Sequence, residues 1–340
     1  MRVVVVGASG NVGSAVLRRL RVDASTEVVG ISRHVPPPGS PSPFDGAWHS
    51  VDVSRPGSVR DLTAAFAGAD AVVNLAWLLQ PNHDERVLAA TNIDGLKHVL
   101  MAVAAAGVPQ VVVASSVGAY SPGPKRRRVD ESWPTGGIAT SHYSRHKAVV
   151  ERILDRFEQE HADVAVARLR PGLVMQAGTG EELRALFMGG LVPVRWLGRV
   201  RVPVVPLPSR AIAQVVHADD LADAVARIVE TRAAGPFNIA AEPVIGPDEV
   251  ARSVGGRALR VRAAPVRALV ALAWRLRLVA ADPGWLDIAV SVPVMSTERA
   301  RAELGWAPTR DSVGALEEVV RAVGARDTTP GSPHLAAPRR

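Results

Sequence analysis

The chain has 340 residues, 47% of them hydrophobic and 21% charged, which is ordinary for a soluble globular protein with one large or two smaller domains. It contains no cysteine, which excludes disulfides, thiolate catalysis and cysteine-ligated zinc and fits a cytoplasmic location. The formal net charge of +7 invites a nucleic-acid role, but the one tight basic run, 125–128, lies beside proline and glycine. That setting predicts an exposed loop, and we expect no nucleic-acid partner.

The first half of the chain alternates short apolar runs with longer helical patterns. Apolar runs without alternating polar residues are typical of parallel strands covered on both faces. We expect strands at 2–6, 27–31, 48–53, 71–74, 110–114 and 164–169, and helices at 12–20, 59–66, 84–106 and 140–160. This order predicts an α/β protein with a Rossmann-type, doubly wound parallel sheet.

The pattern changes after residue 172. Residues 173–213 are rich in proline, glycine and arginine, and residues 214–240 return to the strand and helix pattern. We therefore predict a sheet domain made of 1–172 plus 214–240. A smaller, mostly helical C-terminal part, 173–213 plus 241–323, would bind substrate, and the tail 327–340 would be disordered.

One later segment, 269–278, combines leucines with arginines. It is far shorter than the roughly 20 apolar residues that span a bilayer. It could lie on a membrane surface, but we favour a helix packed on its own domain and expect no membrane partner.

A glycine turn follows the first strand. Gly7, Gly10 and Gly13 have the spacing G-x-x-G-x-x-G between a valine-rich strand and a helix. Glycines allow a tight turn and bring the backbone close to a pyrophosphate, which then lies on the positive end of the helix. The turn, with Ser9, Asn11 and Val12 also among its residues, predicts that the sheet domain binds NAD(P).

The second strand ends in Ser32 and Arg33, at the place where an acid commonly binds the ribose hydroxyls of NAD(H). Without that acid nothing repels a 2′-phosphate, and an arginine can pair with it through two hydrogen bonds. The sequence therefore favours NADP(H) over NAD(H). Asp52 and Val53, after the third strand, are candidates for contact with the adenine.

Tyr143 and Lys147 form the most informative pair in the chain. Only three of the 40 basic residues are lysines and only two residues are tyrosines, yet one of each lies four positions apart. On a helix these positions share a face, and an ammonium favours the ionised form of a nearby phenol. The pair predicts a proton-transfer site.

These motifs together resemble the extended short-chain dehydrogenase/reductase superfamily, in its NAD(P)-dependent epimerase/dehydratase branch. The resemblance covers roughly residues 1–323. Other segments similar to the family are 74–76, 113–116 followed by Tyr120, 130–134, 170–172, 216–222 and 301–306.

The resemblance implies hydride transfer with a Ser-Tyr-Lys site. Tyr143 would be the general acid/base, because its reference pKa of about 10 needs lowering for use near neutrality. Lys147 would provide that help and hold the nicotinamide ribose. Ser116 would polarise the substrate oxygen.

Other roles also follow from the resemblance. Leu75, Ala76 and Pro171 would contact the cofactor. Trp77, Leu173 and Val174 would line the substrate pocket together with Ser116 and Tyr143. No metal is expected.

We favour an oxidoreductase that uses NADP(H) to interconvert a ketone and a secondary alcohol on a small, fairly apolar substrate. Nucleotide-sugar enzymes of the family usually carry an asparagine and Tyr-Gly-Pro after the Arg-Pro turn, whereas residues 170–176 read RPGLVMQ. A nucleotide-sugar epimerase or dehydratase with retained NAD is the second hypothesis. A third is a non-catalytic NADP(H)-sensing regulator.

Since the family dimerises through its two long helices, here 84–106 and 140–160, a homodimer is expected.

Overall fold

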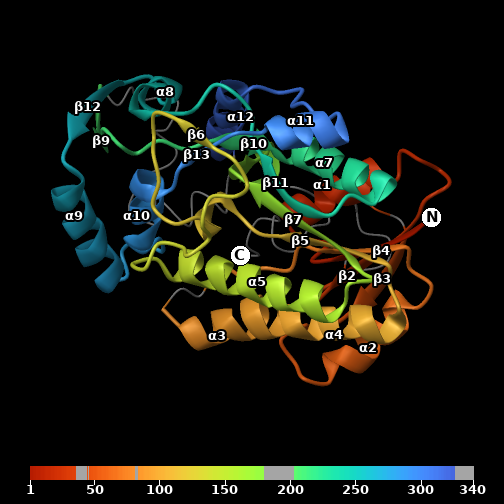
Figure 1. The fold of residues 1–340 in the computed structure, drawn as a ribbon. Helices are drawn as coiled ribbons and strands as arrows, with labels where there is room; N and C mark the ends of the chain where they lie inside the picture. Colours follow the sequence, from red (N-terminus) through yellow and green to blue (C-terminus); the bar gives the residue numbers. More distant parts are fainter. Residues whose placement is uncertain (36–43, 45, 81–82, 180–202, 326–340) are drawn as a thin grey trace.

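The computed structural model describes residues 1–35, 44, 46–80, 83–179 and 203–325 (Figure 1). Its centre is a sheet of seven parallel strands in the order β11-β7-β5-β4-β1-β2-β3. These strands are β1 (Arg2–Val6), β2 (Glu27–Ser32), β3 (Ala47–Ser50), β4 (Ala71–Asn74), β5 (Gln110–Ala114), β7 (Ala165–Pro171) and β11 (Gly235–Ile239). The order reverses between β1 and β4, so the carboxyl ends of these two strands border a crevice that suits a ligand.

Helices cover both faces of this sheet. Because successive strand residues point to opposite sides, Val3 and Val5 belong to one core and Val4 and Val6 to the other. The helices of the first face are α1 (Asn11–Leu20) and α7 (Ala218–Thr231), and those of the second are α2 (Ser58–Phe66), α4 (Gly95–Ala106) and α5 (His142–Glu160). The predicted doubly wound α/β fold is confirmed.

The helix predicted at 84–106 is interrupted. α3 (Glu85–Ala89) and α4 are joined by a π-helical turn, Ala90–Asp94, a distortion often found near functional sites. Residues 85–106 are long and apolar enough to cross a membrane, but half of the apolar window is buried inside the protein. In this fold the segment is a covering helix of the sheet, packed against α2.

The C-terminal part combines helices with short strand pairs. β8 (Leu173–Met175) pairs with β10 (Val215–His217), β9 (Val204–Pro208) with β12 (Arg257–Val261), and β6 (Arg128–Val129) with β13 (Val294–Met295). The helices are α8 (Pro247–Ser253), α9 (Ala263–Arg275), α10 (Gly284–Ser291), α11 (Glu298–Leu304) and α12 (Ser312–Ala325). The division into two domains stays a prediction. Residues 180–202 of its second part, and the predicted disordered tail, lie outside the described residues.

One buried carboxylate joins α5 to the sheet. The side chain of Glu151 is fully buried and accepts two hydrogen bonds of 2.9 Å from Arg170 on β7. It also accepts hydrogen bonds from Arg168 at 3.1 Å and from the Ser115 hydroxyl at 2.5 Å. Although burial acts in the other direction, the Arg170 guanidinium holds the pKa of Glu151 below its usual value. Removing one partner of such a pair leaves an uncompensated charge in the protein interior.

We expect Glu151→Ala to lower the free energy of unfolding by about 3–5 kcal/mol, because it leaves the buried Arg170 guanidinium without its carboxylate partner, whereas Arg168 keeps Asp155 and Glu158. Glu85→Ala is the matched control. It breaks an exposed ion pair between Glu85 of α3 and Arg145, which lies on α5 like Glu151, and should cost less than about 1 kcal/mol. Urea unfolding followed by circular dichroism measures both, and equal losses would show that the buried pair has no special weight.

Candidate active site

The glycine turn lies at the carboxyl end of β1. Gly7 has φ +81°, and a Cβ there would come within 2.7 Å of the Ala76 backbone nitrogen. A Cβ on Gly13 would lie 2.3 Å from the Gly7 carbonyl oxygen. Both positions therefore require glycine, and the turn packs directly on the chain that follows β4.

The N-terminus of the helix after this turn suits an anion. α1 begins at Asn11, no side chain caps it, and its first turn holds no acid, so its positive end is uncompensated. Ser9 is buried in the turn. The Asn11 side-chain oxygen is buried and has no hydrogen-bond partner among the described residues. This uncapped cradle fits the pyrophosphate of a dinucleotide.

The residues predicted at the adenosine end lie after β2 and β3. Arg33 is half-buried, and the Ser32 hydroxyl donates to the His34 carbonyl at 2.7 Å. Burial favours the neutral acid at Asp52, but hydrogen bonds from Ser54 and the charge of Arg33 outweigh it and lower its pKa.

Two of these residues already have structural partners. Asp52 accepts hydrogen bonds from the Ser54 backbone at 3.0 Å and from its hydroxyl at 2.7 Å. The Val53 carbonyl lies 2.8 Å from His98 Nδ1. Their contact with an adenine stays a prediction.

The segment after β4 is held in place by the π-helical turn. Leu75 donates its backbone N–H to the Val6 carbonyl at 2.8 Å, and Ala76 donates to the Asn74 side chain at 3.3 Å. Asn92 pairs with both backbone groups of Leu78, at 2.7 and 2.9 Å. These bonds fix Trp77, which lies between Ala76 and Leu78.

Ser116 and Tyr143 meet at the carboxyl end of β5. The Ser116 oxygen accepts a 3.0 Å hydrogen bond from the Gly118 N–H and is hydrogen-bonded to Tyr143. A Cβ on Gly118 would lie 2.8 Å from the tyrosine ring, so only glycine admits the ring here. Burial raises the pKa of Tyr143 to about 12, against the opposing effect of the bond with Ser116.

Lys147 lies on the same face of α5. Its Nζ donates to the Ala114 carbonyl at 2.8 Å and lies 3.4 Å from the centroid of the Trp77 ring and 5.9 Å from that of Tyr143. Burial lowers the pKa of Lys147 to about 7, although Glu151 favours the charged form. The sequence suggested that the ammonium would lower the pKa of Tyr143, whereas in the protein by itself burial dominates at both groups.

Two tryptophans border the phenol. The Trp77 ring meets Tyr143 edge-on at 5.6 Å, and Trp285 from α10 lies at 4.8 Å. Trp77 Nε1 is buried without a hydrogen-bond partner among the described residues. Sequence reasoning missed Trp285, because nothing local connects a residue of α10 with α5. The glycine two positions after Ser116 could have indicated Gly118.

The remaining predicted residues lie further along β7 and β8. Pro171 ends β7, at the same edge of the sheet as Ser116. Leu173 packs with the cluster around α12, and Val174 packs against the core beneath α7. No described contact brings Leu173 or Val174 to Tyr143, so their role in substrate binding stays a prediction.

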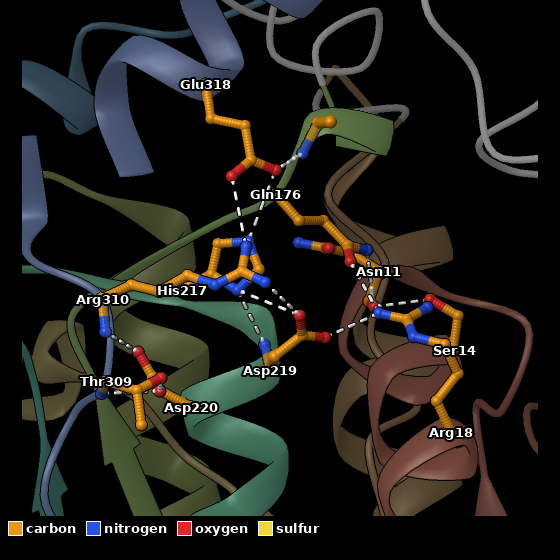
Figure 2. A network of polar contacts seen from close by, with 11 residues as sticks. Asn11, Ser14, Arg18, Gln176, His217, Asp219, Asp220, Thr309, Arg310 and Glu318 are labelled. Atoms are coloured by element: carbon orange, nitrogen blue, oxygen red, sulfur yellow. Dashed lines mark hydrogen bonds and ion pairs between the residues drawn. The ribbon is translucent and has the colours of Figure 1, made fainter. Parts of the chain in front are cut away.

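A polar network fixes the glycine turn to the C-terminal part (Figure 2). Gln176 donates to the Asn11 carbonyl at 3.0 Å and accepts from Arg18 at 3.3 Å. Arg18 and Arg310 both pair with Asp219, at 2.8 and 3.1 Å. The start of α1 is thereby held by Gln176, which follows β8, and its later part by Asp219 of α7, which Arg310 also binds.

Three residues of the basic run 125–128 are exposed, as expected, but Lys125 is half-buried. Lys125 Nζ donates to the carbonyls of Ile212 and Ala289 at 2.9 and 2.7 Å, and burial, helped by Arg210, lowers its pKa to about 7. Arg128 pairs with Glu242 at 2.8 Å, and Arg127 lies over the Trp133 ring. Of the four cations only Lys125 is drawn into the protein, while Arg127 and Arg128 make their contacts at the surface.

A cavity of about 550 Å³ lies beside this run. Its walls carry three arginines and otherwise small or apolar residues. The lining residues are Pro122, Gly123, Pro208, Ser209, Arg210, Arg260, Val261, Arg262, Ala263, Val290 and Ser291.

Comparison with known proteins identifies a family and several relatives that this chain resembles. Residues 3–240 match the model of the NAD dependent epimerase/dehydratase family. Uncharacterized proteins of Mycobacterium tuberculosis and Mycobacterium bovis are 26% identical over 331 residues, which is 96% of this chain and 30% of theirs. The chain thus spans about a third of the length of these curated relatives.

Solved structures show the same fold. UDP-glucose 4-epimerase of Thermus thermophilus, in complex with NAD, is 21% identical, with a TM-score of 0.69 over 95% of this chain and 99% of that one. UDP-N-acetylglucosamine 4-epimerase of Bacillus cereus is 16% identical, with a TM-score of 0.68 over 97% and 99%.

The two tyrosines give this site an optical test. Burial raises the pKa of Tyr120 as well as Tyr143 to about 12, so the protein without cofactor should show almost no tyrosinate absorbance until the pH comes within about one unit of that value. Saturation with oxidised cofactor, whose nicotinamide is cationic, should lower the pKa of one phenol by about one unit or more.

Tyr143→Phe should abolish this cofactor-dependent change, and Tyr120→Phe should keep it. A cofactor-dependent change that survives in Tyr143→Phe would mean that the nicotinamide does not lie beside Tyr143.

Proposed function

The chain belongs to the NAD dependent epimerase/dehydratase family, and within this family of NAD(P)-dependent enzymes we propose that it is an oxidoreductase for a ketone or secondary alcohol. The observation that carries the proposal is the meeting of Ser116, Tyr143 and Lys147 at the edge of the sheet that also holds the glycine turn. The cytoplasmic location and the homodimer through α4 and α5 are proposed with it.

The cofactor site fits NAD(P) at the uncapped start of α1. Gly7, Gly10 and Gly13 bring backbone close to a pyrophosphate, and Leu75 and Ala76 border the turn on the β4 side. Pro171 and Lys147 would bound the nicotinamide end. When bound, the nicotinamide supplies the hydride acceptor or donor.

Tyr143 would transfer the proton at the substrate oxygen. In the reducing direction its phenol donates a proton to the developing alkoxide, and in the oxidising direction the phenolate accepts the alcohol proton. Ser116, already hydrogen-bonded to Tyr143, would donate to the same oxygen and fix its position. Lys147 would stabilise the phenolate once the charge of an oxidised nicotinamide is also near.

The walls of the site support a small, fairly apolar substrate. Trp77 and Trp285 flank the phenol, and rings of this size suit an apolar body. The partnerless Trp77 Nε1 would be satisfied by one acceptor on the ligand. An apolar molecule with a single carbonyl or hydroxyl combines both properties.

NADP(H) is the proposed cofactor. Arg33 is half-buried at the end of β2, where its guanidinium would pair with a 2′-phosphate. The Thermus thermophilus epimerase was solved with NAD, so NAD remains the cofactor of the competing proposal.

A nucleotide-sugar epimerase or dehydratase is that competing function. Arg210, Arg260 and Arg262 line the large cavity, and arginines suit the diphosphate of a nucleotide sugar.

A steady-state assay separates the candidates. Net NADPH consumption with a panel of ketones supports the reductase, and turnover of UDP-sugars without net change in cofactor supports the epimerase. Cofactor binding with neither activity supports the NADP(H)-sensing regulator.

Tyr143→Phe should lower kcat roughly 10²–10⁴-fold while the Kd for NADPH changes little, because the phenol supplies the proton and not the binding energy. The matched control is Tyr120→Phe, which removes a buried hydroxyl bonded to Asn238 and costs stability rather than kcat. If Tyr143→Phe and Tyr120→Phe are both folded and lose kcat equally, Tyr143 is not the proton donor that we propose.

Arg33→Ser should raise the KM for NADPH roughly tenfold or more and leave the KM for NADH within about twofold, because only NADPH carries the 2′-phosphate. Arg55→Ser, which removes another arginine near Asp52, serves as the control. A parallel rise for both cofactors in Arg33→Ser would argue against a 2′-phosphate contact.

A further inference from the structure

α9 is an apolar helix that contributes no fully buried side chain to the protein core. None of its residues is buried, although its sequence contains no polar side chain apart from its two arginines. One side, including Val266 and Val270, is half-buried, and Trp274 stacks on His83 at 4.3 Å. The expected packing on its own domain therefore covers only one side.

The other side presents leucines to solvent. Leu269, Leu272 and Leu276 are spaced three and four residues apart and therefore share one face at the end of the helix. They are 68%, 55% and 60% exposed, and Leu278 beyond them is 40% exposed. A contiguous apolar face of this kind marks a surface that meets a partner.

The charge around this face is uniformly positive. Residues 250–281 contain seven arginines and no acidic residue. Arg252, Arg260 and Arg267 pair with carboxylates outside this range. The others, Arg257, Arg262, Arg275 and Arg277, have no acidic partner among the described residues.

We propose that α9 and residues 276–278 dock the protein on an anionic lipid surface. The leucines would enter the boundary between headgroups and acyl chains, and Arg262, Arg275 and Arg277 would pair with lipid phosphates. Both features are needed, since a short apolar face binds weakly by itself and the arginines add the attraction to negative lipid.

Other partners fit this face less well. In a symmetric pair of copies, the partnerless arginines of one protomer would approach those of the other, and no carboxylate of this segment would offset the repulsion. A nucleic acid would satisfy the arginines but leave the leucines without an apolar partner. Lipid matches both chemistries.

The position of α9 suits such docking. It lies at the periphery of the molecule beside α10, on the side away from the edge strand β3 (Figure 1). The arginine-lined cavity opens beside its first turn, since Arg262 and Ala263 belong to the cavity wall. Docking would bring that cavity close to the lipid surface. The inference does not depend on the proposed reaction.

Sedimentation with vesicles tests the proposal. The protein should pellet with vesicles of phosphatidylcholine and phosphatidylglycerol, pellet much less with phosphatidylcholine alone, and be released as salt rises. Leu269→Ser/Leu272→Ser/Leu276→Ser should reduce binding roughly tenfold or more. Val22→Ser, which changes an apolar residue 78% exposed elsewhere, should bind as the unchanged protein does.

Arg275→Gln/Arg277→Asn should lose most of the preference for anionic vesicles, with Arg126→Gln, exposed in another loop, as its control. Circular dichroism establishes that each variant is folded, and NADPH binding without vesicles should be unchanged in all of them.

Three results would overturn the proposal. One is failure of the unchanged protein to pellet with anionic vesicles, and another is undiminished pelleting of the folded triple leucine variant. The third is a dimer in sedimentation velocity that the leucine changes convert to monomer, which would assign the face to a second copy instead.

Discussion

The site depends on the burial of one carboxylate. Glu151 follows Tyr143 and Lys147 at intervals of four, so these three side chains lie along one face of α5. With its charge shared between Arg170, Arg168 and the Ser115 hydroxyl, Glu151 can occupy only one position over β5 and β7. That position sets the register of α5 on the sheet and brings the phenol to Ser116. The geometry of the proposed catalytic residues therefore rests on an interaction outside the proposed reaction.

Burial also opposes charge at Tyr143 and Lys147, the two groups proposed for acid/base chemistry. A phenol whose pKa is raised to about 12 and an ammonium whose pKa is lowered to about 7 both resist carrying charge. The hydrogen bond from Ser116 and the charge of Glu151 oppose this tendency without reversing it. Under the proposed function, the positive charge of a bound oxidised cofactor would favour the phenolate, which couples acid/base activity to occupancy of the site.

Local signals predicted the elements, and tertiary contacts decided most of what was missed. The uninterrupted valines of β1 and the glycines after it specify a strand and turn in any context, whereas β3 ends three residues before the predicted 53. The run 125–128 was expected to be exposed because its neighbours are turn residues. Yet Lys125 finds two carbonyls that lie 87 and 164 residues away in the chain. Similarly, Trp285 reaches Tyr143 only through the packing of α10.

Lys125 also acts as a mechanical coupling. Its single ammonium joins the loop after Tyr120 to Ile212, before β10, and to Ala289, one turn of α10 beyond Trp285. A displacement of α10 that carries Trp285 away from the phenol must either break the bond between Lys125 and Ala289 or pull Lys125, and with it Ile212, along. Entry to the site from that side is therefore a concerted movement of three segments rather than the swing of one side chain.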